Sequence, residues 1–99
     1  MSKRIFSYEE AIELLPEVQR LTESAARRID ELEEAESSES EQVIADWAES
    51  VLGLGVEVKG LWLVDFDSGS GYYCWRYPEP ALEYFHEYDE GFSGRVKLN

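Results

Sequence analysis

Apolar positions along the first third of the chain recur with the spacing of an amphipathic helix. They fall at residues 11, 14, 15, 18, 21, 25, 29 and 32, so that one stripe continues for more than twenty residues. Pro16 interrupts this stripe, because a proline inside a helix removes a backbone hydrogen bond and clashes with the preceding turn. The pattern therefore predicts a short helix over 8–14 and a long one from 16 to about 36, with a single kinked helix as the alternative.

A second amphipathic segment follows a polar stretch. Residues 36–41 are all serine or glutamate and predict the turn of a helical hairpin. Ser38 and Glu41 have the spacing of a capping box, as do Ser7 and Glu10 at the start of the first helix. The apolar face of the second segment comprises Val43, Ile44, Trp47, Ala48, Val51 and Leu52, and glycines at 53 and 55 predict its end. Two such helices joined by a short loop are expected to pack antiparallel.

The second half of the chain has the composition of a β-sheet. Residues 61–66 and 72–77 are rich in β-branched and aromatic side chains, and the turn cluster 67–71 between them predicts an antiparallel hairpin. A hairpin alone is marginally stable, so a third strand or a helix must cover it. Residues 81–88 fit a strand or a helix, and their aromatic content favours the strand. The expected fold class is α+β: an antiparallel helical hairpin followed by a small antiparallel β-sheet of two or three strands.

Length and composition limit the number of domains. With 99 residues the chain is expected to form one domain, with the helical hairpin over about 8–54 and the β-rich part over about 56–99. Hydrophobic residues make up 43% of the chain, which is enough for a core and argues against disorder.

The charge is strongly acidic and unevenly distributed. The chain carries 22 acidic and 9 basic residues, a formal net charge of −13, and the segment 7–50 alone contributes −11. Such a surface repels nucleic-acid backbones and anionic membranes, so neither is an expected partner. The acidic helical face is interpreted as a solvated surface, with docking of a basic partner or of cations as the alternative.

Nothing in the sequence predicts export or membrane insertion. The single cysteine cannot form an internal disulfide, which favours a reducing compartment. No stretch approaches the roughly 20 apolar residues of a membrane span, and the first residues lack the apolar region of a signal peptide. A cytoplasmic location is the resulting expectation.

The aromatic residues are concentrated in the β-rich part. Ten of the 13 lie after residue 60. Because a small sheet has two faces and a short hairpin covers one of them, part of this set is expected in an interface. A homodimer meets this requirement and also covers the spare apolar length of the first helix. The sequence therefore favours a homo-oligomeric interaction or binding module over an enzyme, with no small-molecule ligand identified.

The motifs of the last third resemble those of a known prokaryotic family. Val64-Asp-Phe66, Cys74-Trp-Arg76, Glu79, His86-Glu-Tyr-Asp89 and Gly91-Phe-Ser-Gly-Arg95 follow the order found in domain of unknown function 2203 (DUF2203). Phe6 to Pro16 is similar to the start of that family as well. The combination is specific, although no single piece of it is. The resemblance implies a bacterial or archaeal cytosolic protein and implies no particular activity.

The only histidine is the centre of a candidate metal site. His86 has acidic neighbours in the sequence, and the candidate ligands beside it are Glu79, Glu83, Glu87 and Asp89, with Cys74 nearby. Glu10 or Glu13 of the first helix could complete a site for one ion. One histidine with carboxylates suits a hard or borderline divalent cation better than a thiolate-seeking one. The competing interpretation is a structural histidine hydrogen-bonded to Asp65 or Glu79, and general acid–base chemistry is a third.

Two further motifs could carry chemistry. Cys74 lies close to Arg76 and could be an activated nucleophile, but its place within a strand favours a buried, inert thiol. Arg76 and Arg95 could clamp an anionic ligand, although salt bridges to internal carboxylates such as Glu79 are favoured in so acidic a chain. The sequence has no glycine-rich phosphate loop, Cys-x-x-Cys pair or nucleophile elbow, which disfavours nucleotide-binding and zinc-finger functions.

Overall fold

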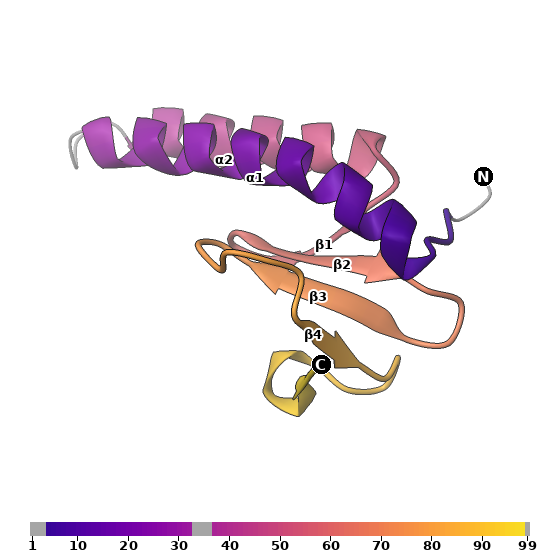
Figure 1. Ribbon diagram of the computed structural model, residues 1–99. Coiled ribbons are helices and arrows are strands. Elements are labelled where there is room, and N and C mark those ends of the chain that lie inside the picture. The colour runs from indigo at the N-terminus through magenta and orange to yellow at the C-terminus, as the bar shows by residue number, and fades with distance from the viewer. Residues whose placement is uncertain (1–3, 33–36, 99) are drawn as a thin grey trace.

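The computed structural model describes residues 4–32 and 37–98, which form two helices and one antiparallel sheet (Figure 1). Helix α1 spans Tyr8–Glu31 and α2 spans Ser37–Gly53. The strands are β1 (Glu57–Gly60), β2 (Leu63–Asp67), β3 (Tyr72–Arg76), β4 (Tyr84–His86) and β5 (Val96–Lys97), and a 3-10 turn, η2, spans Phe92–Gly94. Among the described residues, no helix is both long enough and apolar enough to cross a membrane.

The sheet confirms the predicted α+β class but is larger than expected. Its five strands pair in the order β1-β2-β3-β4-β5, so the prediction of two or three strands is wrong. The hairpin of β2 and β3 and the strand within 81–88 are confirmed. Residues 61 and 62 belong to the turn between β1 and β2, where Trp62 has a φ of 59° and its ring packs edge-on against Trp47.

Helix α1 is continuous through Pro16, so the predicted break into two helices is wrong. The capping box at its start is confirmed, with Ser7 and Glu10 each accepting a hydrogen bond from the other's backbone N–H. Buried side chains lie on both sides of the proline: Ala11 and Leu15 precede it, and Val18 follows it. Pro16 itself is exposed. Packing on both sides of the proline therefore outweighs the hydrogen bond that it removes.

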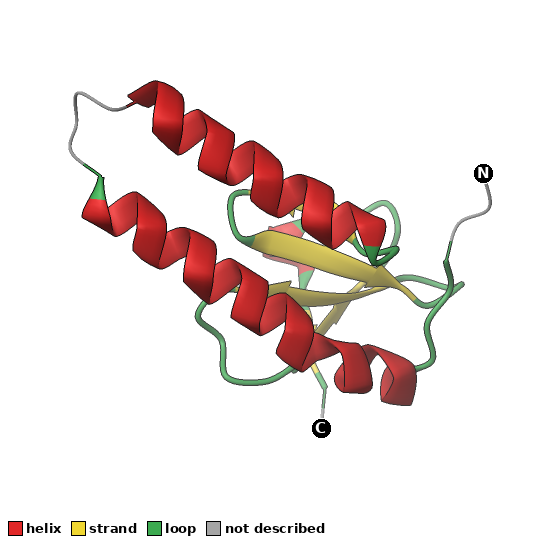
Figure 2. Cartoon of the chain, turned by 90° about the horizontal axis from the view of Figure 1, so that it is seen from above, coloured by secondary structure: helices red, strands yellow, loops and turns green. Residues whose placement is uncertain are grey.

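Helix α2 lies antiparallel beside α1 as predicted (Figure 2). It begins at Ser37, so Ser38 lies inside the helix rather than at its N-cap, and residues 37–41 are helical rather than a turn. The remainder of the predicted turn, 33–36, lies outside the described residues. The end at Gly53 agrees with the prediction, and Gly55 follows with a φ of 86°, which favours glycine.

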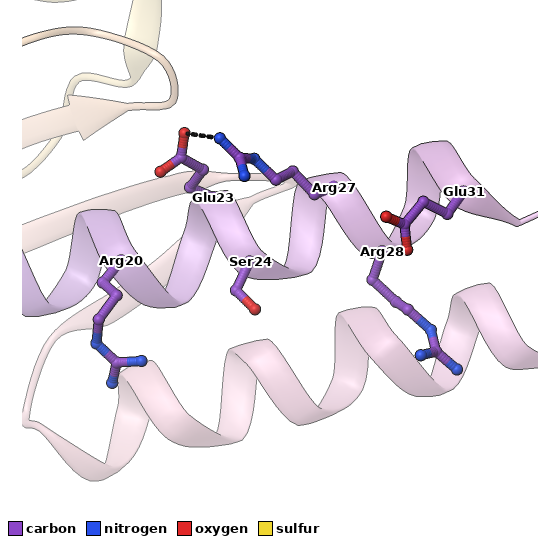
Figure 3. A pocket seen from close by; sticks show the side chains of 6 residues that line it. All are labelled: Arg20, Glu23, Ser24, Arg27, Arg28 and Glu31. Carbon is purple, nitrogen blue, oxygen red and sulfur yellow. Dashed lines mark hydrogen bonds and ion pairs between the residues drawn. The ribbon is translucent and has the colours of Figure 1, made fainter.

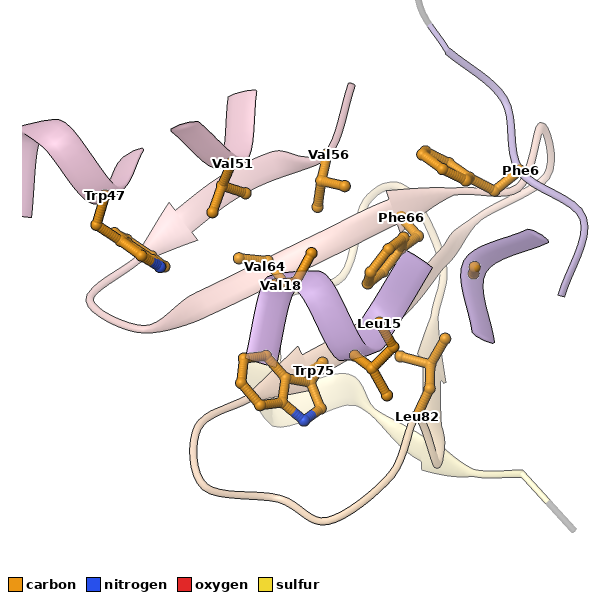
Figure 4. Close-up of a cluster of buried hydrophobic side chains, with 11 residues drawn as sticks. Phe6, Leu15, Val18, Trp47, Val51, Val56, Val64, Phe66, Trp75 and Leu82 are labelled. Atoms are coloured by element: carbon orange, nitrogen blue, oxygen red, sulfur yellow. The ribbon is translucent and has the colours of Figure 1, made fainter. Parts of the chain in front are cut away.

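The two helices cover one face of the sheet and form the hydrophobic core with it (Figure 4). Side chains of β2 and β3 that point toward the helices include Val64, Phe66 and Trp75, each at most 1% exposed. The remaining core residues are Phe6, Ala11, Leu15, Val18, Trp47, Val51, Val56 and Leu82. In β2 these apolar residues alternate with Asp65 and Asp67, which therefore lie on the opposite face of the sheet.

The C-terminal segment 87–95 covers that opposite face, on the side of the sheet away from the helices (Figure 1). Tyr88 donates a hydrogen bond to Asp67 Oδ1 at 2.6 Å, and its ring packs edge-on against Tyr72 at a centroid distance of 5.0 Å. Both faces of the central strands are thus covered within one chain. Part of the aromatic set nevertheless remains exposed, since Tyr88 and Phe92 are 48% and 40% exposed, and the expected interface stays a prediction.

Candidate metal site

Strand pairing brings three potential metal ligands together on the face away from the helices. Asp65 pairs with Cys74 across β2 and β3, and His86 of β4 pairs with Tyr72, two residues along β3 from Cys74. Paired residues and every second residue share a face, so Asp65, Cys74 and His86 converge. One ligand atom from each lies within 4.8 Å of the other two, and none of the three residues is more than 4% exposed.

The imidazole of His86 is fixed by hydrogen bonds from both ring nitrogens. Nδ1 lies 2.9 Å from the backbone carbonyl of Glu87, and Nε2 lies 2.9 Å from Asp65 Oδ2. A carbonyl oxygen can only accept, so Nδ1 carries a hydrogen and donates it. The hydrogen bond between Asp65 and His86 is the one that the structural interpretation of His86 predicted, and a proton must lie between Nε2 and Oδ2 to hold the two together.

Asp65 is buried, and one of its carboxylate oxygens lacks a hydrogen bond of good geometry. No hydrogen bond of good geometry reaches Oδ1 within the described part of the chain, while a weak hydrogen bond between the Cys74 thiol and the Asp65 carboxyl group affects the pKa of both groups. Burial raises the pKa of Asp65, and the nearby His86 opposes this change without cancelling it. Lys59 Nζ approaches Oδ2 to 4.0 Å. A buried oxygen without a donor is a group on which a cation can bind.

The Cys74 thiol is not an activated nucleophile in the metal-free protein. Burial, followed by the charge of Asp65, raises the pKa of the thiol to about 12. The Arg95 guanidinium, 4.0 Å from Sγ, works in the opposite direction but does not outweigh burial. The side chain is 1% exposed, which agrees with the predicted buried thiol. A bound cation would be needed to stabilise the thiolate at neutral pH.

A cavity of about 350 Å³ lies directly in front of these three residues. Its remaining walls are formed by Lys59 of β1, Leu63 of β2 and the segment 90–92. The backbone of residues 87–90 forms a turn in which Glu90 N–H donates to the Glu87 carbonyl at 3.1 Å. That same carbonyl accepts from His86, so one turn both orients the imidazole and places Glu90 on the cavity wall.

An arginine clamp holds the covering segment in place. Arg95 Nη2 lies 2.9 Å from Glu79 Oε2 and Nη1 lies 3.1 Å from Oε1, a two-pronged pair that is largely buried. The guanidinium also stacks between the rings of Tyr84 and Phe92, at 3.9 and 4.0 Å from their centroids. Burial alone would lower the pKa of Arg95, but the hydrogen bond and charge of Glu79 outweigh it and raise this pKa. The predicted salt bridge to Glu79 is confirmed.

The structure brings Cys74 to His86 but leaves the carboxylates that the sequence nominated as ligands outside this cluster. Glu79 pairs with Arg95, Glu83 lines an apolar groove beside Leu98, and the side chains of Glu87 and Asp89 are exposed. Glu10 caps α1, and Glu13 is an exposed residue of the same helix. Asp65 was nominated only as a hydrogen-bond partner. The register would have indicated its place beside Cys74, because pairing Asp67 with Tyr72 across the turn also pairs Asp65 with Cys74.

Three arginines of α1 line a separate, exposed pocket of about 390 Å³ (Figure 3). Arg27 points to one side of the helix and pairs with Glu23 at 3.2 Å, whereas Arg20 and Arg28 extend toward α2. Arg20 pairs with Glu17 at 2.6 Å, and Arg28 pairs with Glu39 of α2. Since each guanidinium already has a carboxylate partner, these contacts are surface ion pairs that contribute little stability.

The fold and the site define a small α+β protein with a buried Asp–Cys–His cluster between its sheet and a C-terminal cover. A family model described as "Uncharacterized conserved protein (DUF2203)" matches residues 26–98. The chain therefore belongs to the DUF2203 family, as its motifs predicted. The similarity of Phe6–Pro16 to the start of the family lies before the matched residues. No curated protein and no solved structure shows a significant match to the chain.

Proposed function

We propose that this is a metal-binding protein that takes one divalent transition-metal ion of the zinc type at Asp65, Cys74 and His86. The observation that carries the proposal is the convergence of a carboxylate, a thiol and an imidazole on one buried point, with their ligand atoms within 4.8 Å of one another. Zinc uses these three donor types in proteins, at roughly 2.0–2.3 Å from the metal. Side-chain movements of about an ångström would bring the three atoms to such distances.

The orientation of His86 supports this role. Metal-ligating histidines usually donate their second ring N–H to a carbonyl or carboxylate, which fixes the tautomer and directs the other nitrogen at the metal. Here Nδ1 donates to the Glu87 carbonyl, and Nε2 is directed at Asp65. A metal ion would take the place of the proton between Nε2 and Oδ2. The metal ion would also place a positive charge beside the Asp65 carboxylate, whose Oδ1 has no hydrogen-bond partner of good geometry among the described residues.

The donor set favours zinc over magnesium or calcium. The sequence suggested a hard or borderline cation, because the expected ligands were one histidine and carboxylates, and Cys74 was expected to be an inert buried thiol. Cys74 changes this expectation, since a thiolate is a soft ligand and Mg²⁺ and Ca²⁺ take oxygen ligands almost exclusively. We therefore expect Zn²⁺ binding that an excess of Mg²⁺ or Ca²⁺ leaves unchanged.

The test is metal stoichiometry in matched variants. Protein stripped with EDTA, loaded with Zn²⁺ and dialysed is expected to retain about one ion per chain by elemental analysis, and Cys74→Ala is expected to bind more than about 100-fold more weakly. Glu83→Ala is the control, since Glu83 lies outside the cavity, and it is expected to bind like the parent protein. A parent protein that retains no zinc, or a Glu83→Ala variant that loses as much as Cys74→Ala, would contradict the proposal.

A second candidate function, a homodimeric interaction module, is supported by a different part of the surface. Tyr8 and Ile12 of α1 are 39% and 43% exposed, and they flank an apolar groove of about 440 Å³. The groove continues over Pro16, Ala81 and Leu98 at the C-terminal edge of the sheet. We propose that a second copy of the chain covers this groove.

Light scattering tests the dimer. The expected mass is twice the 11.4 kDa of the chain, and Ile12→Asp is expected to return it to 11.4 kDa because a carboxylate would be buried without a partner. Glu9→Lys, which changes an exposed neighbour on α1, serves as the charge control and is expected to leave the dimer intact. A mass of 11.4 kDa for the parent protein at high concentration would exclude this candidate.

A further inference from the structure

We infer that the metal site is open: a small monoanionic oxygen ligand, of the carboxylate or hydroxamate class, enters the cavity in front of Asp65, Cys74 and His86 and completes the coordination of the ion. The inference rests on the proposed metal binding and adds a ligand class to it. It concerns what binds at the position that the three protein ligands do not fill.

The number of protein ligands is the first argument. The described residues supply three donors from three adjacent strands, β2, β3 and β4. A zinc ion is commonly four-coordinate, and sites with three protein ligands keep the fourth position for water or an exogenous molecule. The strands hold the three donors on a rigid surface, and the remaining side of the cluster faces the cavity.

The size of the cavity is the second argument. Its volume is about 350 Å³, whereas one water molecule occupies roughly 30 Å³ in the liquid. The value lies at the lower end of the roughly 300–1,000 Å³ that ligand pockets span. Glu90 and Phe92 on its rim are exposed, so that a small molecule can enter from solvent. A ligand of a few non-hydrogen atoms therefore fits.

The lining selects the chemistry of the ligand. A divalent ion with ionised Asp65 and Cys74 is electrically neutral and accepts an anion without repulsion. Lys59 adds a positive charge 4.0 Å from Asp65 Oδ2, held over the ring of Tyr72 at 4.2 Å. Glu57, 3.3 Å from the same ammonium, and Glu90, which also lines the cavity, limit this attraction. These opposing charges favour a ligand with one negative charge over a ligand with two.

The other walls describe the rest of the ligand. Leu63 and Phe92 give an apolar boundary that suits a short hydrocarbon group. The Glu90 carboxylate can only accept hydrogen bonds while it is ionised, so it suits an N–H or O–H on the ligand. Acetohydroxamate presents a metal-binding oxygen pair, one N–H and one methyl group, and it is the probe of choice.

Replacing zinc with cobalt gives a spectroscopic signal for ligand binding at the open coordination position. Protein loaded with Co²⁺ in place of Zn²⁺ is titrated with acetohydroxamate at neutral pH, and the visible absorption bands of the ion are followed. A saturable change with one ligand per ion is expected. In protein fully loaded with cobalt, Lys59→Met is expected to weaken acetohydroxamate binding at least about 10-fold, and Lys97→Met, an exposed residue of β5, is the matched control.

A variant that fills the cavity tests whether the ligand binds in front of the ion. Leu63→Trp is expected to retain cobalt and to lose the response to acetohydroxamate, because the indole occupies the space in front of the ion. A cobalt-loaded protein whose spectrum does not change, or one that releases its cobalt to the hydroxamate, overturns the open site and leaves metal binding intact. A protein that takes up no cobalt or zinc contradicts the proposed function itself.

Discussion

His86→Ala is expected to lower the free energy of unfolding of the metal-free protein by about 3–5 kcal/mol, a large part of the stability of so small a domain. The substitution removes the only hydrogen bond of Asp65 Oδ2 that the described residues show and leaves a carboxylate 1% exposed without its partner. Urea denaturation followed by circular dichroism measures the change. Wild-type stability in this variant would show that Asp65 and His86 are not coupled.

The pH dependence of this loss has a definite sign. Burial already raises the pKa of Asp65, and removal of His86 takes away the main opposing influence, so the native state holds its proton more tightly than the unfolded state does. Stability of His86→Ala therefore falls as pH rises above the unfolded pKa of about 3.9. The difference from the parent protein is expected to be larger at pH 7 than at pH 4.

Asp65→Asn separates the charge from the hydrogen bond. An asparagine amide can donate to Nε2 of the Nδ1–H tautomer, so this variant is expected to lose less than about 1.5 kcal/mol. Combined with His86→Ala it is expected to recover about 1–3 kcal/mol relative to His86→Ala alone, because no buried carboxylate remains unpaired. Strictly additive effects would indicate that the two side chains do not form a unit.

Arg95→Ala is expected to lower the free energy of unfolding by about 3–5 kcal/mol. The variant leaves Glu79 without its two-pronged partner and removes the guanidinium from between Tyr84 and Phe92. The segment 91–95 should then separate from the sheet, which hydrogen exchange would report as faster exchange at the backbone N–H groups of Gly94 and Arg95.

Two matched arginine variants make this prediction specific. Arg95→Lys keeps the charge but cannot form the fork, and its loss is expected to be smaller, about 1–3 kcal/mol. Arg76→Ala removes an exposed side chain whose guanidinium lies 5.3 Å from the centroid of the Phe92 ring, and it is expected to lose no more than about 1 kcal/mol. Equal losses for Arg95→Ala and Arg76→Ala would contradict the clamp.

Local patterns predicted the helical half well, with errors at Pro16 and Ser38. The apolar stripe, the first capping box and the glycine at the end of α2 are local signals, and all three are confirmed. Pro16 is also a local signal, but packing of α1 on the sheet keeps the helix continuous through it. Ser38 is another, but α2 begins one residue before it, at Ser37. Tertiary packing contributes more to a helix than the preference of one residue.

The β-rich half was predicted less completely because its strands are short. β1 and β5, which the sequence did not count as strands, have four and two residues, and this is too few for an alternating pattern to be distinguished from a loop. Each is stabilised by pairing with the neighbouring strand, β1 with β2 and β5 with β4. The local sequence pattern of these segments does not show which strand each one pairs with, and this pairing is what makes them strands.

By itself the sequence determined the α+β class, the helical hairpin, the central β-hairpin and the family, and it nominated His86 and Arg95 as candidate site residues. Only the tertiary structure decided which groups surround the histidine. Nearness along the chain favoured Glu83, Glu87 and Asp89, whereas the antiparallel register brings Asp65 and Cys74 to His86 from 21 and 12 positions away. The physical reason is that a sheet places side chains by alternation and cross-strand pairing, so the closest neighbours in space come from other strands.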